Sequence, residues 1–476
     1  MNFRRIMIAA PKSGSGKTVV TCAFLQALRN RGEQVTSFKC GPDYIDPMFH
    51  EKVFGISAYN LDTYFTDEEQ TGMLFAEHAL EKETGYAVME GVMGVYDGLG
   101  GIREEGSSYH LARITGTPIV LVADVKGMGR SILPFLAGFL QYDAEHMIRG
   151  VVLNRISGGY YEILKPLVEE ELHLPVLGFL PEREKYGIES RHLGLVMPDE
   201  LKGMREKLKD ISREAEETIS IPAMMKIAES AGEVWRIYSL CGQKEAKKDD
   251  TGSRPVIGVA RDEAFCFYYR DNLRMLERYG AEIKYFSPLH DGSIPEGCSG
   301  LLIGGGYPEL CAEELERNTA MRISVKKAVE SGMPTVAECG GFMYLHEAIV
   351  DGEGICHEMA GVLRGRCFGT GRPVRFGYVE IWEKDSNFLP GGEKIKGHEF
   401  HYYDSTDPGS DALAKKPVTG KVYPCIVERE NCWLGFPHLY YPSNPAFAEA
   451  FVEKARRYAV NCCTVFFGGL DSFPEV

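Results

Sequence analysis

Short apolar runs alternate with helix-like segments along the first part of the chain. In two of these segments, Thr18–Arg31 and Tyr160–His173, apolar residues recur at helical spacing, which is typical of helices with one buried face. Strands that alternate with helices predict a parallel sheet covered on both faces, and such sheets bind ligands at the carboxyl ends of their strands. The predicted strands are Arg5–Ala9, Val35–Lys39, Ala87–Glu90, Ile119–Ala123, Gly150–Asn154 and Val176–Leu180.

The same alternation begins again after a polar segment. Residues 186–240 are charged and helix-like, whereas residues 241–254 contain glycine, lysine and aspartate without apolar periodicity, which is typical of a linker. Beyond the linker we predict strands at Val256–Ala260, Glu282–Phe286, Gly300–Ile303 and Thr335–Ala337, and a helix at Tyr268–Tyr279. We therefore predict two α/β domains, at residues 1–185 with a helical extension at 186–240, and at residues 255–476.

Composition and charge narrow the class of protein. The chain has 476 residues, too many for one core, with 44% hydrophobic and 25% charged residues, as in an ordinary globular protein. A formal net charge of -15 argues against nucleic-acid binding, and no apolar run reaches the roughly 18 residues that suggest a membrane span. Because the first strand begins almost at the N-terminus, we expect no cleaved signal and a cytoplasmic location.

The 13 cysteines form no C-x-x-C pair, and their number is odd. Structural zinc sites usually use paired cysteines, and disulfide frameworks belong mainly to small secreted chains. We expect most of these cysteines to be small buried thiols.

A glycine-rich segment, Pro-Lys-Ser-Gly-Ser-Gly-Lys-Thr, follows the first strand and precedes the first helix. In such a loop the backbone N–H groups surround phosphate, the lysine reaches the terminal phosphates and the threonine can bind Mg²⁺. The complete motif would begin with glycine, where this chain has Pro11, but the strand-loop-helix context favours an ATP site. The residues predicted to bind nucleotide are Gly14, Ser15, Gly16, Lys17 and Thr18, with Asn154, at the end of a later strand, contacting the adenine.

Acidic residues follow the strands that lie nearest to this loop in the sequence. Glu90 ends a strand where such folds carry a metal-binding acid, so we predict that Glu90 and Thr18 hold Mg²⁺. Asp43 and Asp46 lie in the loop after the second strand, and Asp97 lies in a glycine-rich loop after Glu90. We expect these three aspartates to line the substrate side of the site, although aspartate also favours turns on its own account.

A second chemical motif lies far downstream, where an apolar run leads to Cys339 and two glycines. A sharp strand-to-helix turn exposes a nucleophile, and a helix N-terminus lowers the pKa of a thiol, which favours the attacking thiolate. Attack on an amide also needs N–H donors for the developing oxyanion, and we expect them from Gly305, Gly306 and Gly340.

A base must accept the thiol proton, and His438 is the best candidate among the 12 histidines because it ends an apolar run. His398 and His401 are alternatives. Their H-x-x-H spacing resembles a metal-binding pair, but no third ligand accompanies it.

Together these motifs resemble those of the cobyrinic acid a,c-diamide synthases. The resemblance covers nearly the whole chain in the same order, and it implies a two-domain amidoligase of cobalamin biosynthesis. It implies an N-terminal domain similar to dethiobiotin synthetase that binds MgATP and the corrin, and a class I glutamine amidotransferase-like domain that releases ammonia. It rests on the phosphate loop, Lys39-Cys-Gly-Pro-Asp-Tyr-Ile-Asp-Pro, Met89-Glu-Gly-Val-Met-Gly-Val-Tyr-Asp-Gly, Arg261-Asp-Glu-Ala-Phe-Cys-Phe-Tyr-Tyr, Gly304-Gly-Gly-Tyr-Pro-Glu and Ala337-Glu-Cys-Gly-Gly.

The resemblance makes Cys339 the nucleophile and His438 the base of a glutaminase, and it implies acyl-phosphate intermediates in the amidation. Many amidotransferases carry a glutamate two residues after the histidine, where this chain, like cobyrinate-type members, departs by having Tyr440. What orients His438 is therefore open at this stage. Lys12 is a second departure, because a small residue is expected there.

Two kinds of alternative remain. The sequence does not distinguish amidation of cobyrinic acid from the same reaction on hydrogenobyrinic acid, or on Ni-sirohydrochlorin in coenzyme F430 synthesis. A nucleotide switch of the partitioning type is supported only by Lys12, and the Cys339 motif argues against it. We expect a tetrapyrrole as the partner, with ATP and L-glutamine as co-substrates, and neither nucleic acid nor membrane; a homodimer is compatible with the sequence.

Overall fold

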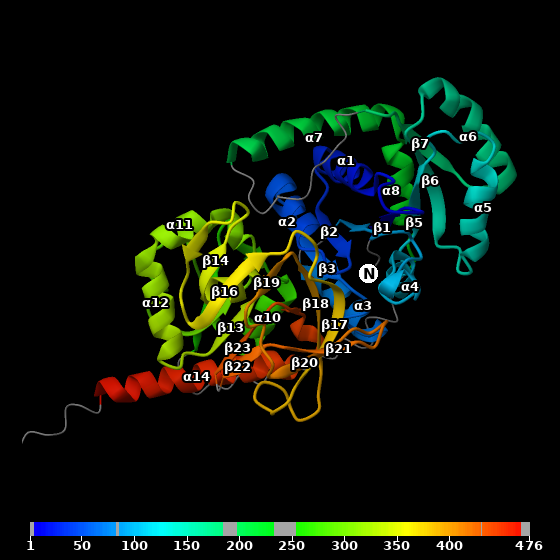
Figure 1. Ribbon diagram of the computed structural model, residues 1–476. Helices are drawn as coiled ribbons and strands as arrows, with labels where there is room; N and C mark the ends of the chain where they lie inside the picture. The colour runs from blue at the N-terminus through cyan, green and yellow to red at the C-terminus, as the bar shows by residue number, and fades with distance from the viewer. Residues whose placement is uncertain (1–3, 82–84, 184–197, 233–253, 430, 468–476) are drawn as a thin grey trace, which may run out of the picture. The chain divides into compact units, whose positions relative to one another are not determined.

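The computed structural model describes residues 4–81, 85–183, 198–232, 254–429 and 431–467 (Figure 1). The chain divides into two compact units, Met1–Gln243 and Lys244–Val476. The predicted helical extension at 186–240 is described in part, as helices α7 (Pro198–Thr218) and α8 (Ile221–Glu229). The predicted linker at 241–254 lies outside the described residues except for Arg254.

The first unit contains a seven-stranded sheet in which all neighbouring strands are parallel, in the order β3-β2-β4-β1-β5-β6-β7. All six predicted strands are present. The additional strand, β3, was missed because its sequence Ser-Ala-Tyr-Asn-Leu contains no apolar run. The strands are β1 (Arg4–Ala9), β2 (Val35–Cys40), β3 (Ser57–Leu61), β4 (Tyr86–Glu90), β5 (Ile119–Asp124), β6 (Ile148–Asn154) and β7 (Val176–Leu180).

Helices cover this sheet on both faces. On one face, Ile6 and Val120 of the sheet belong to the same buried cluster as Leu208 of α7 and Met224 of α8. On the opposite face, α3 packs on β2, where the rings of Phe38 and Phe75 have centroids 5.2 Å apart. The other helices of this unit are α1 (Lys17–Asn30), α2 (Ile45–Phe49), the π-helical turn η1 (His50–Phe54), α3 (Glu68–Glu81), the 3₁₀ turn η2 (Leu99–Gly101), α4 (Ser108–Thr115), α5 (Ile132–Tyr142) and α6 (Gly158–Leu172).

The parallel register brings the predicted site residues to one edge of the sheet. Strand β4 lies between β1 and β2, and Glu90 at its carboxyl end is in register with Ile8 on one side and Lys39 on the other. The phosphate loop leaves β1 at this same edge. Residues distant in sequence are therefore neighbours here, as expected for a ligand site of a parallel sheet.

The second unit is built on a six-stranded sheet in the order β10-β8-β11-β13-β23-β22, in which only β22 pairs antiparallel. Its strands are β8 (Val256–Ala260), β10 (Glu282–Phe286), β11 (Cys298–Ile303), β13 (Thr335–Glu338), β22 (Val427–Arg429) and β23 (Cys432–Gly435). The helices of this unit are α10 (Arg270–Arg278), α11 (Ala312–Arg317), α12 (Thr319–Glu330), α13 (Gly340–Leu345) and α14 (Pro445–Phe467), with 3₁₀ turns η5 (Pro308–Cys311) and η6 (Tyr441–Ser443).

Further sheets that the sequence analysis did not predict complete the second unit, and their neighbouring strands are antiparallel except for the parallel pair β14 and β16. In one of them β24 pairs with β18, which sets His438 directly opposite His398. The sheets are β21-β20-β17-β18-β24, β15-β14-β16-β19 and the pair β12-β9. Their strands are β9 (Phe265–Phe267), β12 (Gly305–Gly306), β14 (His346–Val350), β15 (Cys356–Glu358), β16 (Leu363–Gly369), β17 (Arg375–Glu383), β18 (Ile395–His401), β19 (Tyr403–Ser405), β20 (Ala412–Lys415), β21 (Val422–Cys425) and β24 (His438–Leu439).

Neither unit shows a membrane helix or a protein-only metal cluster in the part that the structure describes. Among the described residues, no helix has the length and apolar character needed to cross a membrane. Over the same residues, no group of three or more histidine, cysteine or acidic side chains is arranged to hold a metal ion.

Candidate active site

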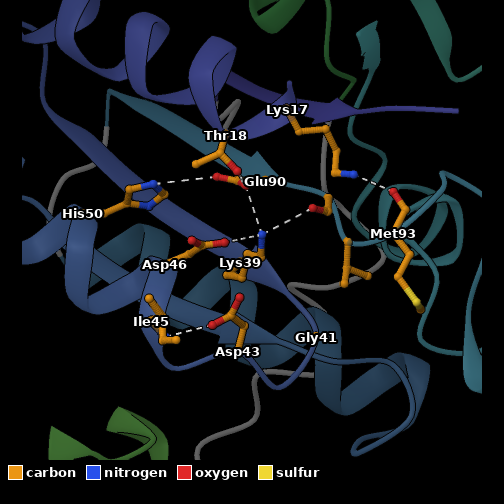
Figure 2. Close-up of polar contacts among 12 residues, drawn as sticks. Lys17, Thr18, Lys39, Gly41, Asp43, Ile45, Asp46, His50, Glu90 and Met93 are labelled. Atoms are coloured by element: carbon orange, nitrogen blue, oxygen red, sulfur yellow. Dashed lines mark hydrogen bonds and ion pairs between the residues drawn. The ribbon is translucent and has the colours of Figure 1, made fainter. Parts of the chain in front are cut away.

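The phosphate loop has the backbone that its glycines require. Gly14 and Gly16 adopt φ values of 75° and 97°, a region that disfavours side chains, and α1 begins at Lys17. The Lys17 ammonium donates a hydrogen bond to the carbonyl of Met93 at 2.5 Å (Figure 2). Burial, reinforced by the charge of Lys39, lowers the pKa of Lys17 to about 8. A bound phosphate would favour its charged form.

Residues at the carboxyl end of β6 hydrogen-bond the phosphate loop. Asn154 donates its side-chain amide to the carbonyl of Ser15 at 2.8 Å, and Arg155 donates to the carbonyl of Gly14 at 2.6 Å. A Cβ on Gly16 would overlap the Asn154 amide, so the two residues are in close contact. Asn154 thus supports the loop, and the predicted adenine contact stays a prediction. Lys12 is exposed, with its ammonium 4.0 Å from the Asp124 carboxylate.

Thr18 and Glu90 meet as a metal pair requires. The Thr18 hydroxyl donates to Glu90 Oε1 at 2.7 Å, and Glu90 is fully buried. No group among the described residues hydrogen-bonds the second carboxylate oxygen, Oε2. Mg²⁺ usually binds one or two protein oxygens together with substrate phosphates, so an oxygen pair beside a phosphate loop fits this ion.

Lys39 is the central residue that the sequence analysis missed. Its buried ammonium lies 2.5 Å from Asp46 Oδ2 and 3.0 Å from Glu90 Oε1, and Figure 2 shows it between the two carboxylates. Burial alone would lower the pKa of Lys39, but Asp46 and Glu90 outweigh it and raise that pKa well above its usual value. Burial would likewise raise the pKa of Asp46, but the Lys39 charge holds it below its usual value. A lysine within an apolar strand was the available signal, because it needs acidic partners.

His50 is the second residue that was missed. Its Nδ1 lies 2.7 Å from the Ser37 hydroxyl. Its Nε2 lies 3.7 Å from Glu90 Oε2 (Figure 2). Burial lowers the pKa of this histidine. It lies in η1, an irregular turn whose position relative to Glu90 could not be read from periodicity.

The other two aspartates form turns, which was the alternative for both. Asp43 accepts from the backbone N–H of Ile45 at 2.8 Å, and Asp97 accepts from that of Gly94 at 3.0 Å. Burial, with the charge of Asp46, raises the pKa of Asp43 to about 6. Asp97 also borders a cavity of about 600 Å³. Its aromatic walls are Tyr96, Tyr109, Phe135, Phe139 and Tyr142, and Arg103 and Arg113 also line it.

The cysteine elbow in the second unit has a strained backbone. Cys339 lies between β13 and α13 with φ 48° and ψ -105°, and its N–H donates to the carbonyl of Gly435 at 2.8 Å. A positive φ is uncommon outside glycine and is often found at functional sites. The expected lowering of the thiol pKa was wrong: burial raises the pKa of Cys339, and the backbone hydrogen bond from Gly340 offsets this only in part.

The predicted oxyanion glycines surround this elbow. The N–H of Gly341 donates to the carbonyl of Gly304 at 2.9 Å, and a Cβ on Gly340 would lie 3.1 Å from the nitrogen of Gly306. A Cβ on Gly305 would overlap the imidazole of His438. The glycine loop therefore lies between the Cys339 turn and His438, and these close contacts leave no room for a side chain at Gly305.

His438 is buried and paired with one of its two rivals. The rings of His438 and His398 stack with centroids 5.1 Å apart and planes inclined by 20°. Burial lowers the pKa of His438 well below its usual value and that of His398 to about 3. The other rival, His401, stacks on Phe436 with centroids 4.2 Å apart. Of the three, His438 is the one against which the glycine loop packs.

Tyr440 does not take the place of the missing glutamate. Its hydroxyl donates to Asp271 Oδ2 at 3.0 Å, and both side chains are buried.

Comparison with known proteins agrees with these two sites. Residues 6–195 match the family described as "CobQ/CobB/MinD/ParA nucleotide binding domain", and residues 256–441 match the "CobB/CobQ-like glutamine amidotransferase domain". The first match contains the phosphate loop and Glu90, and the second contains Cys339 and His438.

Full-length relatives decide the family. Proteins named cobyrinate a,c-diamide synthase are 36% identical in Dehalococcoides mccartyi, over 96% of this chain and 99% of the relative, and 38% identical in Clostridium acetobutylicum, over 95% and 100%. The protein of that name in Thermoplasma volcanium is 36% identical over 96% and 99%. The chain belongs to the cobyrinate a,c-diamide synthase family. The resemblance found in the sequence is thus confirmed, together with the fold class of a P-loop domain and an amidotransferase-like domain.

Proposed function

We propose that this chain uses ATP and glutamine to amidate the a- and c-carboxylates of cobyrinic acid, as a glutamine-dependent ligase of cobalamin biosynthesis. One observation carries the proposal. A phosphate loop with its Thr18–Glu90 pair and a cysteine elbow occur in one chain that matches this family over 96% of its length.

Carboxylates need activation before they can be amidated, because their leaving group is poor at neutral pH. A carboxylate oxygen attacks the γ-phosphorus of ATP, which gives an acyl phosphate and ADP. Ammonia then attacks the acyl carbon, phosphate departs and the nitrogen loses a proton. Lys17 would neutralise phosphate charge, and Thr18 and Glu90 would hold Mg²⁺, which would supply further positive charge beside the phosphates. Lys39 would keep Asp46 ionised and would hold both Asp46 and Glu90 in place.

The second unit would supply the ammonia. His438 takes the proton of Cys339, and the thiolate attacks the glutamine amide carbon. The histidine returns that proton to the amide nitrogen, so that the C–N bond breaks, ammonia leaves and a thioester remains. Water then hydrolyses the thioester, which releases glutamate and the thiol. The N–H groups of Gly305, Gly306 and Gly340 would stabilise the oxyanion.

The test separates the two half-reactions. A Cys339→Ala protein should lose glutamine-dependent amidation but retain amidation with ammonium chloride, measured as amide product and as ADP. Cys367→Ala, which removes another buried free thiol of the same unit, is the matched control and should retain both activities. Absence of any ATP-dependent amidation by the wild-type protein with glutamine and ammonia would refute the proposal.

The macrocycle is proposed on family membership and on the cavity beside Asp97. Its aromatic walls suit the apolar body of a tetrapyrrole. Asp97, which borders the cavity, lies in the same loop as Met93, whose carbonyl accepts the hydrogen bond from Lys17. Cobyrinic acid, hydrogenobyrinic acid and Ni-sirohydrochlorin should be compared by kcat/KM, and we expect cobyrinic acid to give the highest value. A higher value for either competitor would change the substrate and leave the reaction class intact.

We also propose that the chain acts in the cytoplasm. Buried free thiols such as Cys22, Cys40 and Cys367 support a reducing compartment. Cell fractionation would test this location. The homodimer stays a prediction, and size-exclusion chromatography would test it.

A further inference from the structure

A buried carboxylate lies against the candidate base. Glu338, the last residue of β13 and the neighbour of Cys339, places Oε2 3.8 Å from Nδ1 of His438. Its other oxygen, Oε1, accepts from the backbone N–H of Leu439 at 3.3 Å. Glu338 is 5% exposed and His438 is 2% exposed, so this arrangement lies in the protein interior.

We infer that Glu338 is the positioning residue that orients His438 during glutamine hydrolysis, in place of the glutamate that is absent at Tyr440. This inference rests on the proposed function. It assigns a role to a residue of the Ala-Glu-Cys-Gly-Gly motif that precedes the nucleophile. Strand β13 thereby supplies both the nucleophile turn and the group that positions the base.

Close contacts restrict the orientation of the His438 ring. Gly305 packs against one part of the ring, and His398 stacks on it, with its own Nδ1 3.1 Å from the Tyr269 hydroxyl. The bond from Leu439 holds the carboxylate on the side of the ring that carries Nδ1. At 3.8 Å the carboxylate lies beyond hydrogen-bond distance of Nδ1, so its influence there is electrostatic. A negative charge on this side of the ring favours the tautomer in which Nδ1 carries the proton and Nε2 can accept one.

Electrostatics gives the same pair a role during proton transfer. Burial raises the pKa of Glu338 to about 8 and lowers that of His438, so an isolated charge on either group is disfavoured. Above the pKa of Glu338, the charge that His438 gains with the Cys339 proton faces an ionised carboxylate, and the two charges stabilise one another. The other titratable neighbours are His398 and His401, which disfavour a charge on His438, and Tyr268 and Tyr441, which lie near Glu338.

The experiment compares three variants of the full chain. Glu338→Gln keeps the shape but removes the charge, and Glu338→Asp keeps the charge but moves it away from Nδ1. The matched control is Glu383→Gln, because Glu383 is also a buried carboxylate that accepts backbone N–H groups, from Asn387, Phe388 and Leu389. Among the described residues, no histidine forms a hydrogen bond or ion pair with Glu383.

We expect Glu338→Gln to lower kcat for glutamate release by about 100-fold or more, with KM for glutamine changed by less than about threefold. Glu338→Asp should recover part of the rate, and Glu383→Gln should retain it. Amidation driven by ammonium chloride should persist in all three. A step in the glutaminase rate near pH 8 should be present in the wild type and absent in Glu338→Gln, because that variant has no carboxyl group that ionises there.

A Glu338→Gln protein that hydrolyses glutamine within about threefold of the wild-type rate would overturn the inference, as would a loss confined to KM. If Glu338→Gln does not fold, Glu338→Asp decides, and wild-type turnover with an unchanged pH profile in that variant overturns the inference. Failure of the proposed function has a different signature, since the wild-type protein itself would then lack glutaminase or ATP-dependent amidation.

Discussion

At the scale of single residues, two buried ionisable side chains, Lys39 and Glu338, are central to the proposed sites. Lys39 and Glu338 both lie on core strands, and each contacts a residue of a proposed reaction centre. Sequence reasoning predicted Cys339 and Glu90 from the motifs around them, and His438 because it ends an apolar run. It missed Lys39 and His50, because their shared partner Glu90 is distant in sequence and meets them only when the sheet has formed.

Lys39→Met should disable the first unit. The change leaves the buried Asp46 and Glu90 carboxylates without their cation, and breaking a buried ion pair in this way costs about 3–5 kcal/mol. We expect a lower unfolding temperature and loss of ATP-dependent amidation, measured by calorimetry and ADP release. Lys12→Met, which changes an exposed lysine of the phosphate loop, is the control. A Lys39→Met protein as stable as the wild type would show that the ion pairs contribute little.

Glu338 also predicts how stability depends on pH. Its folded pKa of about 8 lies above the ordinary glutamate value, so the folded protein binds a proton more tightly than the unfolded chain. This contribution to stability is complete at acidic pH and is lost as the pH rises through about 8. Glu338→Gln removes that loss. Its unfolding temperature should therefore rise relative to the wild type between about pH 4 and 8, from the ordinary glutamate pKa to the folded one, and a difference that does not vary with pH would contradict the shift.

At the scale of secondary-structure elements, periodicity was sufficient for the parallel core. Most predicted strands of the first unit are short apolar runs, and all six are present. The antiparallel sheet that contains β17 and β18 was missed because these strands mix charged, polar and apolar residues and contain no apolar run. This mattered for the site, since the pairing of β24 with β18 sets His438 beside His398.

The phosphate loop offers a matched pair of glycine substitutions. Gly14 and Gly16 both have positive φ, so alanine costs about 1–2 kcal/mol of backbone strain at either position. Only at Gly16 would the new Cβ also overlap the Asn154 amide. Gly16→Ala should therefore weaken ATP binding more than Gly14→Ala, measured by calorimetry. Equal affinities for the two variants would mean that the Asn154 contact does not shape the loop.

At the scale of the whole molecule, two compact units carry two different chemistries, and the proposed function requires both in one product. Each unit should lose its own half-reaction when its own site is changed. Glu90→Gln should abolish ADP formation and amidation with either nitrogen source, because the proposed Mg²⁺ pair with Thr18 is lost, while glutamate release from glutamine persists. Cys339→Ala should instead lose glutamate release and glutamine-dependent amidation, while ADP formation and amidation with ammonium chloride persist. A Glu90→Gln protein that still amidates with ammonia would remove this carboxylate from the ATP site.

The stoichiometry of the complete reaction gives the strictest test of this division. Each amide should consume one ATP and one glutamine and release ADP and phosphate, because an acyl phosphate forms by attack on the γ-phosphorus. A diamide should therefore appear with two equivalents of each product, measured by mass spectrometry of the macrocycle alongside nucleotide chromatography. Pyrophosphate and AMP in equivalent amounts would show attack at the α-phosphorus instead. That outcome would require the carboxylate to approach a different part of the phosphate loop, away from Lys17 and the Thr18–Glu90 pair.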